Sequence, residues 1–188
     1  KVFQAPRIYR NLLSSQPLCF NLFGELQQDL ELTTALMRSL APSRIARVTR
    51  TEFEYSPGRD DPRYTDDRSA FDVYLEFKTP QGGEGFVGIE VKYSEDLGGR
   101  AAPHRARYDE VASIMGCFKA HKFSELRTQP LQQMWRDHLL AGSLRHQNDF
   151  DDGFFAFIYP EENRACARAV SAYRYCLRDC DPFVEWTL

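Results

Sequence analysis

The chain has 188 residues, of which 43% are hydrophobic and 13% aromatic. This composition supports one globular domain over residues 1–188 and excludes a disordered chain. The net charge of −3 gives no sign of a nucleic-acid-binding surface, and no apolar run is long enough to cross a membrane. Five cysteines without a secretory signal are typical of reduced thiols, so we expect a cytoplasmic protein.

The first part of the chain combines a helix, a strand and a charged loop. Leucines at helical spacing predict a helix over residues 14–40, with Ser14 suited to cap it and Pro42 to end it. Weak alternation predicts a strand over residues 45–55. Residues 56–68 are rich in Pro, Gly and charge, which predicts a loop.

The most informative segment is a predicted β-hairpin, with arms reading FDVYLEFK and GFVGIEVKY around the turn TPQGG. Each arm alternates cleanly, so its apolar side chains share one face and its polar side chains the other. Asp72, Glu90 and Lys92 lie on the polar face, beside Glu76 and Lys78, which need only contact solvent. Charges in the middle of well-formed strands indicate a chemical role.

The predicted register brings two of these charges together. If the turn centres on Gln81, Asp72 lies opposite Glu90 with Cβ atoms about 4.5–5.5 Å apart, a separation at which like charges destabilise a sheet. A hard cation such as Mg²⁺ or Mn²⁺ between the carboxylates turns this repulsion into binding. Lys92, about 6.6 Å further along the same face, is placed to hold an attacking water or to neutralise developing negative charge.

The second half of the chain alternates helices with strands. Residues 107–119 are predicted to be helical, and Leu131 to Gly142 mark the apolar face of an amphipathic helix. Residues 154–159 fit a buried central strand, followed by a helix over 161–178 and a short strand over 183–187. This order predicts a mixed α/β fold in which a mixed central sheet is flanked by helices.

That order of elements, with Asp72 on the second strand and Glu90-Val91-Lys92 on the third, resembles the PD-(D/E)XK nuclease superfamily. The resemblance implies a restriction-endonuclease-like αβββαβ core over roughly residues 15–160. The stretches SSQPLCFNLFGEL, DRSAFDV and GIEVKY look like a bacterial branch of proposed restriction endonucleases. Phe71 stands where a proline often precedes the aspartate of the family.

The resemblance implies a metal-dependent nuclease that hydrolyses phosphodiester bonds, most directly a DNA endonuclease of restriction or defence type. By resemblance, Asp72, Glu90 and the backbone carbonyl of Val91 would bind Mg²⁺, with Mn²⁺ able to substitute. Lys92 would orient the attacking water, because a lysine with an ordinary pKa near 10.4 is a poor general base at neutral pH.

Other candidates come from the helices and from basic segments. Many family members carry a further acidic residue on the first core helix, and Glu25 matches it, ahead of Glu31 and Glu52. Gln16 is a candidate for phosphate contact, although its cluster with Ser14 also suits helix capping. The other candidates for substrate contact are Arg107, in a basic stretch, and Gln132 and Arg136, spaced i, i+4 on the later helix.

Several alternatives stay open. The substrate is expected to be DNA, but RNA fits the same residues, and a homodimer is compatible with restriction-type cutting. A catalytically inactive fold could serve as a binding module for nucleic acid or protein. An iron–sulfur exonuclease could hold its cluster with Cys19, Cys166, Cys176 and Cys180, although the spacing of the last three is not the usual tight one. No G-x-S-x-G, C-x2-C or H-E-x-x-H motif indicates a serine hydrolase or a zinc site.

Overall fold

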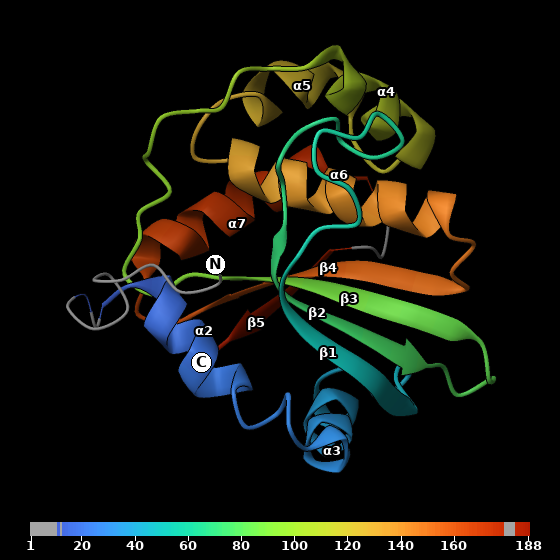
Figure 1. Ribbon diagram of the computed structural model, residues 1–188. Helices are drawn as coiled ribbons and strands as arrows, with labels where there is room; N and C mark the ends of the chain where they lie inside the picture. The colour runs from blue at the N-terminus through green and yellow to red at the C-terminus, as the bar shows by residue number, and fades with distance from the viewer. Residues whose placement is uncertain (1–10, 12, 179–182) are drawn as a thin grey trace.

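The computed structural model describes residue 11, residues 13–178 and residues 183–188 (Figure 1). Within these residues, one mixed sheet has the spatial order β1-β2-β3-β4-β5. Its strands are β1 (Arg47–Tyr55), β2 (Phe71–Lys78), β3 (Glu84–Val91), β4 (Asp152–Tyr159) and β5 (Phe183–Thr187). The first three strands pair antiparallel, whereas β3 with β4 and β4 with β5 pair parallel.

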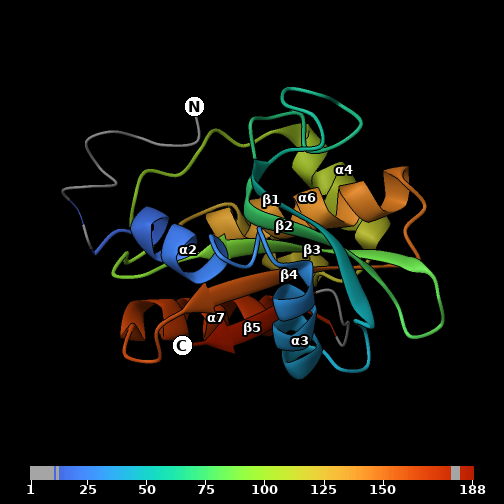
Figure 2. The ribbon, with the colours of Figure 1, turned by 60° about the horizontal axis from the view of Figure 1, so that its bottom comes forward.

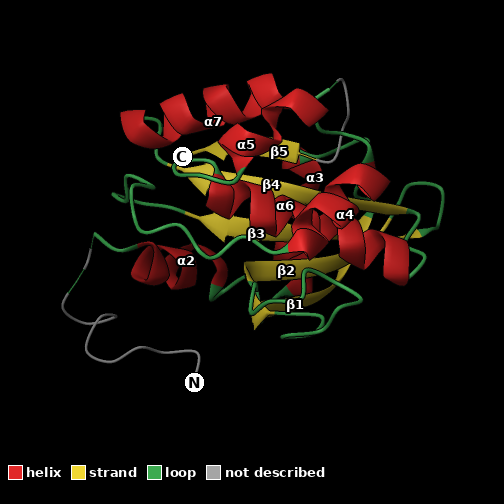
Figure 3. Ribbon diagram, turned by 90° about the horizontal axis from the view of Figure 1, so that it is seen from above, coloured by secondary structure: helices red, strands yellow, loops and turns green. Residues whose placement is uncertain are grey.

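Helices cover both faces of this sheet, as Figures 1 and 3 show. On one face lie α2 (Ser15–Phe23) and α3 (Leu30–Leu40), and on the other lie α4 (Ala106–Met115), α6 (Gln132–Gln147) and α7 (Arg164–Cys176). The short η1 (Ala120–Lys122) and α5 (Phe123–Leu126), which the sequence did not predict, precede α6. The predicted mixed α/β fold with helices on both sides of a mixed sheet is confirmed.

Strand alternation divides the interior into two cores. Val73, Leu75 and Ile89 pack toward α2 and α3, whereas Tyr74 and Phe86 pack toward α6. Burying a large apolar side chain contributes about 1.5–3 kcal/mol, so both faces of the hairpin are fixed by packing. A slip of one residue in register would exchange the two faces and is therefore excluded.

The predicted single helix over residues 14–40 is wrong, because the chain forms two helices there. The N–H of Gly24 donates to the carbonyl of Phe20 at the end of α2, and turns follow. Asp29 then caps α3, since its carboxylate accepts hydrogen bonds from the N–H groups of Glu31 and Leu32, at 3.0 and 2.9 Å. The leucine spacing continues through the break, which is why the pattern did not reveal it.

Other predicted boundaries shift by a few residues. The helix expected to reach residue 119 ends at Met115, because Gly116 adopts a φ of 66° and closes the helix in a left-handed conformation. The buried strand expected from residue 154 begins at Asp152. Helix α7 begins at Arg164 rather than at residue 161, where the side chain of Asn163 accepts from the N–H of Cys166.

These elements leave one end of the sheet crowded with polar side chains. The start of β2 and the end of β3 meet there because the hairpin is antiparallel. Figure 2 shows α2 beside the carboxyl ends of β3 and β4. The residues that the sequence singled out lie at this end.

Candidate active site

The hairpin has the predicted register. Val73 pairs with Ile89 and Lys78 with Glu84, so the turn centres on Gln81 and Asp72 is aligned with Glu90. Gly82 supplies the positive φ of 89° that the reversal requires. The side chains of Asp72 and Glu90 therefore lie on the same face of the sheet, toward α6.

Hydrogen bonds fix the acidic side chains at this end. Lys92 Nζ donates to Glu90 Oε1 over 2.5 Å, and Gln133 Nε2 donates to the same oxygen over 2.5 Å. Asp72 Oδ2 accepts from the backbone N–H of Val91 at 2.9 Å. Glu90 is 4% exposed and Lys92 8% exposed. Glu90 and Lys92 therefore lie in a largely dry environment, and Asp72 is half-buried beside them.

Burial and mutual charge shift the pKa values of these groups. Burial, and then the negative charge of Glu90, raise the pKa of Asp72 well above its ordinary value. For Lys92 burial lowers the pKa, but the charge and hydrogen bond of Glu90 outweigh burial, so that the pKa is raised. Lys92 therefore keeps its positive charge at neutral pH, which suits electrostatic stabilisation better than proton abstraction.

Helix α6 brings two residues to the site that the sequence did not single out. Gln133 is one, through its bond to Glu90. Asp137 lies one helical turn later on the same face, is 5% exposed, and its Oδ2 has no hydrogen-bond partner. Burial, and then the charge of Glu90, raise its pKa. In the sequence, Asp137 could have been identified as a carboxylate that interrupts the apolar stripe of α6.

Strand β1 brings a third unexpected residue, Glu54. The pairs Phe53 with Val73 and Tyr55 with Phe71 flank it, so Glu54 is aligned with Asp72. Glu54 remains open to solvent, yet the pKa of its carboxyl is raised, first by partial burial and then by the charge of Glu90. Nothing in the weak alternation of this strand marked Glu54.

The two predicted substrate contacts on α6, Gln132 and Arg136, bind other parts of the protein. The side-chain amide of Gln132 accepts from the N–H of Ala102 at 2.6 Å and donates to its carbonyl at 2.7 Å. The guanidinium of Arg136 donates to Asp67 and to Ser69, each at 2.8 Å from Nη2. Gln132 thus holds the segment after β3, and Arg136 holds the loop before β2.

Arg107 also anchors that loop. Its Nε donates to the carbonyl of Tyr64 at 2.9 Å and its Nη2 to the carbonyl of Arg63 at 3.1 Å, while Nη1 pairs with Glu110. Arg107 and Arg136 therefore fix the segment that leads from β1 into β2.

The N-terminal candidates lie on or near α2. Ser14 caps this helix, since its Oγ accepts from the N–H of Gln16 at 3.4 Å, and the expected capping role is confirmed. Glu25 lies exposed in the turn after α2. The charged groups with the largest effect on the pKa of Asp72 are Glu90, Lys92 and Glu54, and Glu25 is not among them.

The two weaker acidic contenders have local roles. Glu31 lies exposed in the first turn of α3, where negative charge favours the helix N-terminus. Glu52 accepts two hydrogen bonds from Arg50 on its own strand.

The donor set at this end of the sheet fits a hard divalent cation. Asp72 and Glu90 each use one carboxylate oxygen in the bonds above and keep a second, and Asp137 Oδ2 is buried without a partner. Carboxylate oxygens are the ligands that Mg²⁺ and Mn²⁺ prefer. Among the described residues no three His, Cys, Asp or Glu side chains form a ready-made metal group, so a cation would have to draw these carboxylates together.

The cysteines do not fit an iron–sulfur cluster. Cys19 packs between the sheet and α2, whereas Cys166 and Cys176 pack in the core on the opposite face. Cys180 lies outside the described residues, and the four described cysteines are free thiols. Because the sheet separates Cys19 from Cys166 and Cys176, these three described cysteines do not gather around one cluster.

Comparison with known proteins identifies a family for this chain. A family model described as the PD-(D/E)XK nuclease superfamily matches residues 1–188. No curated protein and no solved structure matches the chain. In the part of the chain that the structure describes, no helix is both long and apolar enough to cross a membrane.

Proposed function

The chain belongs to the PD-(D/E)XK nuclease superfamily, and on this basis we propose that it is a Mg²⁺-dependent DNA endonuclease of restriction or defence type. One observation carries the proposal: Asp72 on β2, Glu90 on β3 and Lys92 directly after β3 meet at one end of the sheet, where the two strands are in matching register. A binding module gains nothing from aligned carboxylates that would face a phosphate, so the arrangement favours hydrolysis over binding alone.

Asp72, Glu90 and the carbonyl of Val91 would hold the divalent cation, which when bound stabilises charge on the phosphate and lowers the pKa of a water ligand. The N–H of Val91 fixes the orientation of Asp72, and Gln133 fixes that of Glu90. Such supporting bonds hold reactive side chains in the geometry that catalysis requires.

Lys92 has a separate task in this proposal. Its ammonium, kept charged by Glu90, orients the attacking water and neutralises negative charge that develops on the phosphate. Because Lys92 and Glu90 are almost fully buried, this electrostatic effect acts in a low-dielectric environment, where it is stronger than in water.

Cleavage of circular DNA, linear DNA and RNA in Mg²⁺ or Mn²⁺ tests the proposal. We expect cleavage of DNA, including the circular form that lacks ends, and loss of cleavage in excess chelator. Lys92→Ala should abolish cleavage without unfolding the protein. Lys78→Ala is the matched control, because Lys78 lies at the far end of β2 and pairs with Glu84.

Full activity in chelator or in Lys92→Ala would contradict the proposal. Binding to DNA without cleavage under any metal condition would support the inactive binding module instead. Sedimentation of the protein on a duplex tests the homodimer that cutting both strands would use.

A further inference from the structure

The exposed face of helix α7 carries positive charge alone. Residues 163–178 contain four arginines and no aspartate or glutamate, although the whole chain has a net charge of −3. All four are exposed, and they are Arg164, Arg168, Arg174 and Arg178. A helix face that only contacts solvent typically carries charges of both signs. The single sign of this face therefore indicates a negatively charged partner.

The basic residues of α7 continue onto the neighbouring segment at η1. Arg164, Arg168 and Tyr175 are spaced by four and seven residues, so they lie along one line of the helix, opposite its buried residues. Tyr175 is 65% exposed. The Nζ atoms of Lys119 and Lys122 lie 4.8 and 4.7 Å from the centroid of its ring. These five residues form what we call the basic stripe.

The charge at the start of the basic stripe is not compensated. At the far end Lys122 pairs with Glu125 at 2.6 Å. Among the described residues, however, Arg164 and Arg168 form no ion pair, not even with the nearby Glu162. A positive group near a helix N-terminus costs about 0.3–1 kcal/mol, yet Arg164 opens α7 and its first turn contains no acidic residue. A bound anion would stabilise both the arginines and the helix end.

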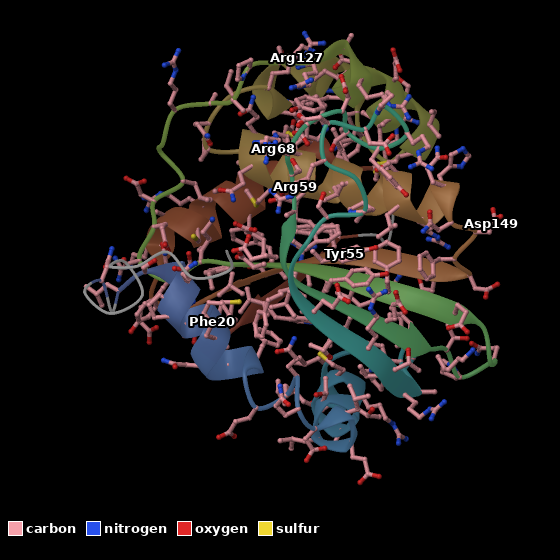
Figure 4. All side chains as sticks on the ribbon, viewed as in Figure 1. Phe20, Tyr55, Arg59, Arg68, Arg127 and Asp149 are labelled. Carbon is pink, nitrogen blue, oxygen red and sulfur yellow. The ribbon has the colours of Figure 1, made fainter. Side chains whose placement is uncertain are left out.

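The loop between β1 and β2 shows the opposite arrangement. Figure 4 labels Arg59 and Arg68, two of the three arginines in this loop. Residues 56–68 also contain four aspartates, and Arg68 pairs with Asp60 at 3.2 Å. Positive charge in that loop is therefore balanced by negative charge from the same loop, whereas the charge of Arg164 and Arg168 is not.

The basic stripe begins beside the proposed active site. Asn163, which caps α7, donates from Nδ2 to the carbonyls of Tyr93 and Glu95, at 2.8 and 3.0 Å, and Tyr93 directly follows Lys92. A hollow of about 480 Å³ lies there, with Tyr93 and Arg164 in its lining. Because α7 connects the parallel strands β4 and β5, it runs back from this end of the sheet, as Figure 1 shows. The stripe therefore leads away from the site.

We propose that the basic stripe binds the phosphate backbone of duplex DNA outside the active site and so holds the DNA during cleavage. The proposal rests on the proposed function, because it adds a contact to the substrate named there. Contacts to phosphates position DNA without reading its sequence. At 1.5 Å per residue, Arg164 and Tyr175 lie about 16 Å apart. Since each strand of DNA places a phosphate every 3.4 Å or so along the axis, the stripe would follow about five base pairs.

Fluorescence anisotropy of a labelled DNA duplex, measured over a range of salt concentrations, tests the basic stripe. Lys92→Ala in Mg²⁺ serves as the parent protein, so that the duplex stays intact. Adding Arg164→Gln and Arg168→Gln together should reduce the slope of log affinity against log salt concentration by about 1.8, because each phosphate contact contributes about 0.9. Near physiological salt, this corresponds to binding about 30-fold weaker. Arg38→Gln with Arg47→Gln is the matched control, because both arginines are exposed on α3 and β1 and the same charge is removed. This control should bind like the parent.

The outcomes separate this inference from the proposed function. Unchanged binding in the Arg164 and Arg168 double variant, or an equal loss in both double variants, would overturn the role of the basic stripe and leave the proposed function intact. Loss of binding to phosphatidylserine vesicles with unchanged DNA affinity would assign the stripe to a membrane surface and also overturn it. A wild-type chain that cleaves no nucleic acid, but binds DNA through these arginines, would contradict the proposed function and support the stripe. If the double variant does not fold, Arg168→Gln alone decides, since an unchanged salt slope overturns the inference.

Discussion

Alanine substitutions at Gln132 and Gln133, adjacent on α6, should separate stability from activity. Gln132 is 1% exposed and makes two hydrogen bonds with Ala102. Each such bond contributes a net of about 0.5–1.5 kcal/mol, so Gln132→Ala should lower the free energy of unfolding by about 2 kcal/mol. The cleavage rate per folded molecule should change little, because this side chain holds the segment after β3 rather than the site.

Gln133 is half-buried and its bond at 2.5 Å goes to Glu90. Loss of a group that orients a metal-binding side chain typically costs 10- to 100-fold in metal affinity or activity, which is about 1.4–2.7 kcal/mol. We therefore expect Gln133→Ala to cleave DNA about 10- to 100-fold more slowly, with stability reduced by less than about 1 kcal/mol. Urea unfolding followed by tryptophan fluorescence, and cleavage rates in Mg²⁺, measure the two effects.

Gln147→Ala, at the exposed end of the same helix, is the control for helix propensity. An unchanged cleavage rate in Gln133→Ala would refute the role of Gln133 in orienting Glu90. A rate loss in Gln132→Ala equal to that in Gln133→Ala, at a temperature where both are folded, would instead favour the substrate contact that the sequence suggested.

Two further predictions concern buried polar groups that are not among the proposed metal ligands. Asp67→Asn removes the negative partner of Arg136. Because breaking a buried ion pair costs about 3–5 kcal/mol, the free energy of unfolding measured by urea titration should fall by about 3 kcal/mol. An unchanged free energy of unfolding would show that this ion pair does not contribute to stability. Burial lowers the pKa of His138 to about 3. At pH values below the ordinary histidine pKa of about 6.5, the unfolded chain therefore binds a proton that the folded chain excludes. As the pH falls through this range, the free energy of unfolding should decrease by about 1.4 kcal/mol per pH unit. His138→Gln should remove that part of the slope between pH 6.5 and about 4, and identical slopes in the two proteins would contradict it.

The hairpin was predictable because its determinants are local. Alternation with period 2 fixes the face of each side chain, and the turn residues fix the centre at Gln81, all within a short stretch of chain. The alignment of Asp72 with Glu90 follows from these two facts alone. The break between α2 and α3 was not predictable from the leucine spacing, since it depends on one capping residue, Asp29.

The choice between two adjacent glutamines illustrates a different difficulty. Successive residues on a helix differ in direction by about 100°, so the rotation of α6 against the sheet decides whether Gln132 or Gln133 meets Glu90. Apolar residues surround both positions, including Met134 and Trp135, and the pattern leaves that rotation uncertain by about one residue. The packing of α6 against β3 and β4 determines this rotation, and no local pattern in the sequence predicts it.

Glu54 depends on packing still more strongly. A regular strand assigns Phe53 and Tyr55 to one face, and only the left-handed backbone between them puts them on opposite faces. Such a change is tolerated at β1 because, among the described strands, β1 pairs with β2 alone and no further ladder constrains its outer edge. Irregularities that redirect a side chain are common at sheet edges and next to active sites. An irregularity at the end of this edge strand therefore leaves undisturbed the register that aligns Asp72 with Glu90, whereas the same irregularity in β3 would break that alignment.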